Sequence, residues 1–406
     1  MARVLAAIGA LTIALCASGW AGDMSACQTL MNSRELHEPG PLFLTSFPAA
    51  ASGPLHDTAF LYDNAVAIIA LTGCGRPDQA SRIGEAILIA LDHDRYWTDG
   101  RLRNAYLAGP VKHRPLPLPG WWEPAQNKWV EDRYHVGSDT GNMAWAMLAL
   151  LTLYEQDREP SYLSGAERIG RYIETSWSDL RPRGYDGGQF GHEPVPEPNR
   201  WKSTEHNTDL AAAFGRLARD SGDAYWAIRS KRATAFVAAM WNDTCHCFAV
   251  GTGDDGHTRN RLLALDAQLW PVLAIPAGLQ RFPGALATAQ IRLRYGDGFA
   301  YSEAGNGIWT EGTAQVGLVM ALDRSSGYQT ALLSAIMRNR TADGSYYAAD
   351  GPSLPTGFRL QTDPTQPREY FHTPHLAALA WVALLEQRLN PFTGTRALPE
   401  ASDRQD

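Results

Sequence analysis

Residues 139–151 read DTGNMAWAMLALL, and residues 205–217 read EHNTDLAAAFGRL. Each stretch opens with four or five polar residues and then becomes almost wholly apolar. A helix that is apolar all round is surrounded by protein, whereas a surface helix keeps one polar face. We therefore expect both stretches to be buried helices whose polar first turns reach an open end of the molecule.

The same pattern recurs along the chain, and each apolar helix is followed by an amphipathic partner. The expected pairs are 61–72 with a helix ending near 91, 139–151 with 162–177, 205–217 with 224–241, 265–275 with 283–293, 311–322 with 328–337, and 372–385 with a segment near 24–35. Six buried helices ringed by six amphipathic ones predict an all-α fold, an (α/α)6 toroid of six helical hairpins. Long Pro-, Gly- and Trp-rich loops should lie at one end. The alternative is an unrelated all-α bundle.

The N-terminus has the pattern of a secretory signal peptide. Arg3 precedes an apolar run over residues 4–15, and small residues follow up to Ala21. The run is shorter than the roughly 20 residues that a spanning helix needs. We expect cleavage near Ala21, a secreted or periplasmic protein, a barrel over residues 22–394, and a polar, disordered tail over 395–406. No stable membrane insertion is expected after cleavage.

Charge and cysteine content narrow the possible partners. The net charge is −7, or −8 without Arg3, which argues against nucleic acid as a partner. An oxidising compartment permits disulfides among the remaining four cysteines, but their pairing cannot be deduced from sequence. Cys245-His246-Cys247 lacks a second ligand pair, so we expect a structural or disulfide role and no metal. We expect no cofactor, and the sequence leaves the oligomeric state open.

The polar openings of the inner helices should converge at one end of the ring. One such group is an ordinary helix cap, but six that carry Asp, Glu or His beside amides and hydroxyls exceed what capping needs. Tryptophans and tyrosines in the adjoining loops could stack on sugar rings while polar groups bind hydroxyls. The candidate substrate-binding residues are Asp63, Asn64, Trp122, Trp129, Tyr134, His206, Asp209, Asp266, Gln268, Trp309 and Gln315.

These openings resemble those of the six-hairpin glycosidases, the superfamily of (α/α)6 glycoside hydrolases and related polysaccharide-active enzymes. The resemblance covers about residues 61–392. It rests on Tyr-Asp-Asn-Ala at 62–65, Asp-Thr-Gly-Asn at 139–142, Glu-His-Asn at 205–207, Leu-Asp-Ala-Gln at 265–268 and Trp-Thr-Glu-Gly-Thr-Ala-Gln at 309–315. It implies a glycoside hydrolase that acts on a poly- or oligosaccharide, often with inversion at the anomeric carbon.

Inversion needs a carboxylic acid to protonate the leaving oxygen and a carboxylate to activate water. We assign Glu205 as the acid, beside Trp201 and His206, and prefer Asp139 as the base. Glu311 competes for either role. A polysaccharide lyase or sugar epimerase on the same fold stays open, in which Tyr134-His135 or His206-Asn207 would abstract a proton alpha to a uronate carboxylate. A non-catalytic glycan-binding protein stays open as well. The glycan, its linkage and the choice between endo and exo cleavage stay undetermined.

Overall fold

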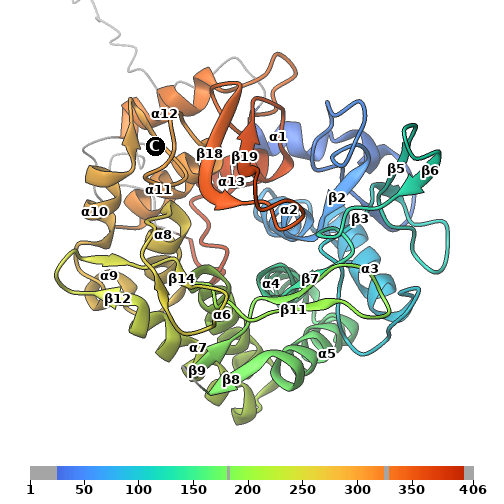
Figure 1. Ribbon diagram of the computed structural model, residues 1–406, viewed down its shortest axis with the longest axis horizontal. Coiled ribbons are helices and arrows are strands. Elements are labelled where there is room, and N and C mark those ends of the chain that lie inside the picture. Colours follow the sequence, from blue (N-terminus) through green and yellow to red (C-terminus); the bar gives the residue numbers. More distant parts are fainter. Residues whose placement is uncertain (1–24, 181–182, 324–328, 397–406) are drawn as a thin grey trace, which may run out of the picture.

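The computed structural model describes residues 25–180, 183–323 and 329–396. The predicted signal peptide and residues 397–406 of the predicted tail lie outside these ranges. Six inner helices form a closed ring around a common axis, because each one packs against the next and the last packs against the first (Figure 1). They are α2 (Leu61–Gly73), α4 (Thr140–Asp157), α6 (Thr204–Ser221), α8 (Leu265–Ala274), α11 (Thr310–Asp323) and α13 (Leu376–Glu386).

The outer helices bury one face against this ring. They are α1 (Ala26–Met31), α3 (Pro77–Asp92), α5 (Pro160–Trp177), α7 (Ala224–Met240), the short pair α9 (Gly278–Arg281) and α10 (Ala285–Arg292), and α12 (Gln329–Arg338). Helix α1 completes the sixth hairpin, as expected: its Ala26 and Cys27 backbone N–H groups donate to the Glu386 carboxylate of α13. The all-α toroid predicted from the sequence is therefore correct.

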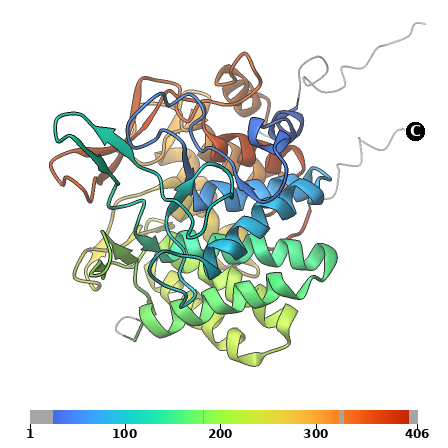
Figure 2. The same ribbon diagram turned by 90° about the vertical axis from the view of Figure 1, so that its right-hand side faces the viewer.

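Short antiparallel strands gather at one end of the barrel (Figure 2). The two-stranded pairs are β1 (Leu42–Phe43) with β4 (Gly109–Pro110), β2 (Thr58–Phe60) with β3 (Ala105–Leu107), β5 (Trp121–Glu123) with β6 (Lys128–Val130), β8 (Ser178–Leu180) with β9 (Arg183–Tyr185), β12 (Trp241–Asn242) with β13 (Cys247–Phe248), β14 (Gly251–Thr252) with β15 (Arg259–Asn260), β16 (Arg294–Tyr295) with β17 (Gly298–Phe299), and β18 (Ser353–Arg359) with β19 (Pro367–Phe371). A three-stranded sheet joins β7 (Ser138–Asp139), β10 (Gly188–Phe190) and β11 (Glu197–Asn199).

The sixth inner helix starts later than the sequence suggested. We expected it from residue 372, but α13 begins at Leu376 with His375 as its N-cap. Pro374 cannot donate a backbone hydrogen bond and restrains the residue before it to extended conformations. His372 instead stacks on Tyr347 and bonds through Nδ1 to the Ala349 carbonyl oxygen at 2.7 Å.

Aromatic side chains fill the barrel axis beneath its open end. Trp145, Trp270 and Trp381 are at most 1% exposed, and the Trp145 ring packs edge-on against Trp270 at 5.3 Å between centroids. Tyr62 and Phe392 pack against the same rings. The middle of the ring is thus a packed core, so a substrate can meet the inner helices only at the barrel ends.

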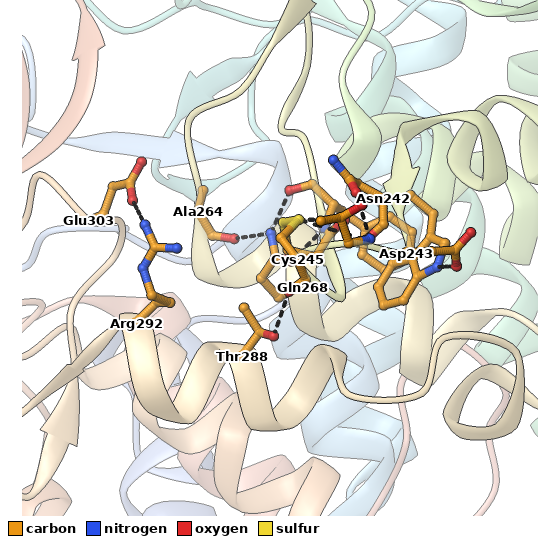
Figure 3. Close-up of a disulfide and its surroundings, with 12 residues drawn as sticks. Asn242, Asp243, Cys245, Ala264, Gln268, Thr288, Arg292 and Glu303 are labelled. Atoms are coloured by element: carbon orange, nitrogen blue, oxygen red, sulfur yellow. Dashed lines mark hydrogen bonds and ion pairs between the residues drawn. A yellow bond between two sulfur atoms is a disulfide. The ribbon is translucent and has the colours of Figure 1, made fainter.

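Two disulfides pair the four cysteines that remain after the predicted cleavage. Cys27–Cys74 joins α1 to the end of α2 across 47 residues, and closing a loop of that length removes roughly 4 kcal/mol of unfolded-state entropy. Cys245–Cys247 closes the turn between β12 and β13 (Figure 3). The described helices include none that is both long and apolar enough to cross a membrane.

Candidate active site

Three carboxylates occupy the same position in three successive inner helices. Glu205, Asp266 and Glu311 are each the second residue of their helices, α6, α8 and α11. Side chains at one register around a ring face the axis at one height, and each of these acids perturbs the pKa of another. Together with Asp63 and Asp209 they form what we call the carboxylate cluster.

In α2, α6 and α8 the fourth residue of the helix has a different task. Gln268 accepts from the Phe248 N–H at 2.7 Å and donates to the Phe248 carbonyl oxygen at 2.9 Å, which pins strand β13 to α8 (Figure 3). Asn64 and Asn207 bind the backbone of residues 44 and 185 in the same way. The amides of Asn64 and Gln268, both candidate substrate ligands, therefore already bind the backbone of the loops and strands at the open end.

Glu205 and Asp266 form a close carboxyl pair. They lie within hydrogen-bonding reach of each other, and burial together with mutual repulsion raises the pKa of Glu205 well above its usual range. Two carboxyl groups this close share a proton, because ionising both would place like charges side by side. Glu205 stays partly open to solvent, whereas Asp209, one helical turn further along α6, is fully buried. The pair therefore offers a proton at the open end, and Asp209 lies beneath it.

Glu311 is held on one oxygen and free on the other. Its Oε1 accepts from the Tyr62 hydroxyl and from Gln315 Nε2, while Oε2 has no hydrogen-bond partner among the described residues. Burial raises the pKa of Glu311 to about 7, against the effects of His375 and of the Tyr62 hydrogen bond. The free oxygen lies 4.0 Å from His375 Nδ1. This oxygen is buried from bulk solvent, so a water molecule or a substrate hydroxyl could meet it only inside the site.

Asp63 completes the acidic side of the site through an ion pair. Its Oδ2 lies 3.2 Å from His375 Nε2, and both side chains are buried. Burial lowers the pKa of His375, but the charges of Asp63 and Glu311 outweigh burial and raise it. A charged imidazolium between two carboxylates fixes both of them.

Asp139 lies to one side, at the N-cap of α4 rather than at the second position of a helix. Its Oδ1 is 3.4 Å from Asn199 Nδ2, and burial raises its pKa to about 7 against the opposing charge of Arg368. Tyr134 is close enough for Asp139 to raise its pKa, although burial is the larger cause. The structure therefore brings Asp139 and Tyr134 to the open end.

Two glycines let aromatic rings lie on the backbone beside Glu205. A side chain at Gly141, the second residue of α4, would meet the His206 ring at 2.4 Å, and one at Gly187 would meet the Trp201 ring at 2.7 Å. The two rings contact each other edge-on at 5.2 Å. Burial and, to a lesser degree, Arg368 lower the pKa of His206 to about 3, so this imidazole is neutral at physiological pH.

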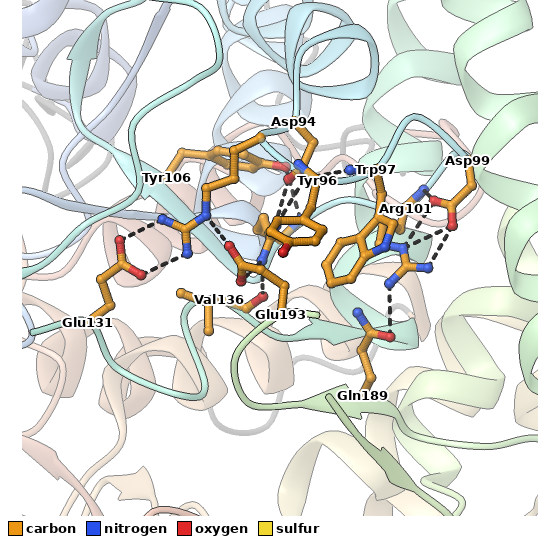
Figure 4. Close-up of polar contacts among 12 residues, drawn as sticks. Asp94, Tyr96, Trp97, Asp99, Arg101, Tyr106, Glu131, Val136, Gln189 and Glu193 are labelled. Atoms are coloured by element: carbon orange, nitrogen blue, oxygen red, sulfur yellow. Dashed lines mark hydrogen bonds and ion pairs between the residues drawn. The ribbon is translucent and has the colours of Figure 1, made fainter. Parts of the chain in front are cut away.

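A buried ionic network supports the loops that carry Tyr134 and Asp139 (Figure 4). Arg103 is fully buried; it pairs with Asp94 at 2.6 Å and Glu193 at 3.0 Å and donates to the Val136 carbonyl oxygen. Arg95 joins Glu193 to Glu131. Removing Arg103 would leave the buried Asp94 without its ion-pair partner, and breaking a buried pair typically costs about 3–5 kcal/mol. The network therefore fixes these loops in place.

Sequence reasoning missed four residues that complete the site. Arg368 and Tyr370 lie two apart on β19, so they share one face of the hairpin, and that face meets the cluster. Tyr370 packs against Tyr301 and Trp309. The alternation of Arg368 and Tyr370 along a strand could have indicated that they share a face, but we predicted no strand in this segment. Tyr62 and His375 stood within the polar openings but were not selected.

The tryptophans have divided roles. Trp309 is 1% exposed and packs under Tyr370. Trp122 and Trp129 face each other across β5 and β6 and are 54% and 56% exposed. Within the ranges that the structure covers, no group of three or more His, Cys, Asp or Glu side chains is arranged to hold a metal ion.

Sequence comparison finds no matching family model and no curated relative, but solved structures share the fold. A glycosidase variant in complex with glucose matches with a TM-score of 0.60 at 13% identity, over 89% of this chain and 95% of its own. A sugar epimerase from a ruminal bacterium matches at 0.60 and 10% identity, over 88% and 95%. A GH76 alpha-mannanase from Bacteroides thetaiotaomicron matches at 0.55 and 11%, over 90% and 96%. The chain therefore has the six-hairpin fold of these carbohydrate-active proteins.

Proposed function

We propose that the protein is a glycoside hydrolase that cleaves a poly- or oligosaccharide with two carboxyl groups and inversion of the anomeric carbon. The observation that carries this proposal is the arrangement of Glu205, Asp266 and Glu311 at one register, where one proton-sharing pair faces a carboxylate with a free oxygen. Inverting hydrolysis needs one proton donor and one base separated by a water molecule.

Glu205 is the general acid of this proposal. Its raised pKa keeps a proton on the carboxyl group near neutral pH, and its partial exposure lets it reach a glycosidic oxygen. Asp266 supports it, since an adjacent carboxyl group discourages ionisation of the pair. When Glu205 has given its proton to the leaving oxygen, both carboxyl groups of the pair are ionised, and the pair takes up a proton from solvent before the next turnover.

Glu311 is the general base. Its buried Oε2 has no hydrogen-bond partner among the described residues and is the oxygen that would take the proton of the attacking water, while Tyr62 and Gln315 hold Oε1 and fix the orientation of the carboxylate. Asp139, the base preferred from the sequence, accepts a hydrogen bond from Asn199 and lies outside the shared register. We therefore propose that Asp139 binds a substrate hydroxyl and that Glu311 activates the water molecule.

Export fits the covalent structure. Disulfides persist in oxidising compartments, and this chain carries two among its described residues, one of which joins the sixth hairpin to the end of α2. We propose that the protein acts outside the cytoplasm, after removal of residues 1–21. The structural neighbours include a glycosidase bound to glucose and an alpha-mannanase, so hexose polymers are the first substrates to test.

The test is a digestion screen with purified protein on soluble glucan, mannan, arabinan and polyuronate. New reducing ends are measured together with the ultraviolet absorbance of unsaturated uronates. Reducing ends without absorbance support hydrolysis, and Glu205→Gln should then lower turnover about 10²- to 10⁴-fold, the usual contribution of a general acid. Glu85→Gln, on the exposed side of α3, is the matched control. Wild-type turnover in Glu205→Gln would remove the assignment.

A sugar epimerase is the second candidate, and the neutral imidazole of His206 beside Glu205 is the observation that favours it. An uncharged imidazole can abstract a carbon-bound proton. In that case the screen would show isomerised sugar without new reducing ends. Ultraviolet absorbance that rises with the reducing ends would indicate a lyase. No reaction with any of the polymers would favour a glycan-binding protein.

A further inference from the structure

The hairpin β18–β19 reaches over the carboxylate cluster. Thr356 Oγ1 donates to the Arg368 carbonyl oxygen at 2.7 Å, which ties the two strands together at the point where Arg368 projects. Tyr370, two residues further along, packs against Trp309 at 5.4 Å between ring centroids. The inner face of the hairpin is therefore part of the site.

The Arg368 side chain is exposed and lies on the same face of β19 as Tyr370. Its charge acts on groups from several parts of the ring: Tyr134, Asp139, Glu205, Asp266 and Tyr301. No ion pair within 4.0 Å and no hydrogen bond of this guanidinium is found among the described residues, and the side chain keeps access to solvent. Its five N–H donors are therefore open to a ligand, without a protein partner among the described residues.

The tip of the hairpin is fastened to the opposite wall of the site. Gln361 Nε2 donates to Asn199 Oδ1 on β11 at 2.8 Å, across 162 residues of sequence. Asn199 also contacts Asp139. The turn itself is ordered by Asp363, whose carboxylate accepts from the Thr365 N–H and hydroxyl. We call this hairpin the strap, and the Gln361–Asn199 hydrogen bond its latch.

We propose that the strap closes one side of the site, so that the enzyme acts on the ends of glycan chains and Arg368 binds hydroxyls of the terminal sugar. The argument is geometric: a polymer cannot run straight across an axis that a latched hairpin crosses, but a chain end can enter beside Glu205 and stop at Arg368. The inference rests on the proposed hydrolase function and adds exo specificity to it.

The experiment follows product size and viscosity on the same soluble glucan, mannan, arabinan and polyuronate. Exo cleavage releases one small product from the first minutes, and viscosity falls little for each reducing end formed. In Gln361→Ala the latch is lost; a neutral hydrogen bond of this kind shifts an open–closed balance by about 2- to 10-fold. The loss of viscosity for each reducing end should rise by a similar factor. Gln366→Ala, in the same turn, is the control, because its side chain makes no such bond.

A second variant tests the terminal-sugar contact. Arg368→Met should raise KM for the cleaved substrate by about 10-fold or more, because hydrogen bonds from a charged donor are lost, while Arg359→Met on the same hairpin should leave KM unchanged. A ladder of oligosaccharides with an early fall in viscosity from the wild-type protein overturns the inference and leaves the hydrolase intact. Absence of new reducing ends overturns both. Equal behaviour of Gln361→Ala and Gln366→Ala shows that the strap does not set specificity.

Discussion

Replacing Tyr62 by Phe should move the acidic limb of the pH–activity profile upward. The Tyr62 hydroxyl donates to Oε1 of Glu311 and so stabilises the ionised carboxylate, which opposes the effect of burial on the pKa of Glu311. A hydrogen bond to a charged group contributes about 1.5–3 kcal/mol. At 1.36 kcal/mol for each pKa unit, its loss raises the limb by about one to two pH units. If the pKa of the base is about 7 in the wild-type protein, a rise of one unit lowers its ionised fraction at pH 6 about ten-fold, and a rise of two units lowers it further.

The assay is kcat/KM against pH, since this quantity reports the essential groups of the free enzyme. Tyr96→Phe, at an exposed tyrosine, is the matched control. Tyr62→Phe also deprives Trp381 Nε1 of its acceptor, so the rates are measured well below the melting temperature of the variant. A limb that overlays the wild-type profile would refute the assignment of Glu311 as the base. A limb that moves to lower pH would refute the sign of the argument.

Three further outcomes are expected. The free energy of unfolding should fall as pH rises from about 4.5 to 7, because burial holds the pKa of Glu311 at about 7 in the folded protein. Glu311→Gln should remove roughly 3 kcal/mol of this decrease, measured by urea unfolding at several pH values. A decrease of the same size in the variant would contradict this. Gln268→Met should lower the free energy of unfolding by about 2–4 kcal/mol by stranding two backbone groups, whereas Gln366→Met should be neutral in the same measurement. Trp129→Ala or Trp122→Ala should raise KM for polymers about 2- to 10-fold and leave KM for disaccharides unchanged if the exposed indoles stack on a bound chain; equal changes for both substrates would argue against that role.

The sequence alone was sufficient for the architecture. Apolar helices alternate with amphipathic ones, and this alternation requires an inner and an outer ring, whatever the details of the loops. It also located most of the carboxylate cluster, since Asp63, Glu205, Asp266 and Glu311 all stand in the polar first turns of inner helices. Convergence of helix starts at one end of a ring is a property of the fold, so these residues could be grouped before any coordinates were known.

The tertiary structure decided which polar residue in each first turn faces the axis. The second and fourth residues of a helix lie about 200° apart around it, so Glu205 reaches the site while Asn207 binds a strand, and Asp266 and Gln268 divide in the same way. Both residue types look alike in a polar opening, because either could bind a sugar hydroxyl. The sequence could not predict a role for Arg368 for another reason. The strap is placed at the site by long-range packing and by the latch to Asn199, and no local pattern encodes a contact across 162 residues.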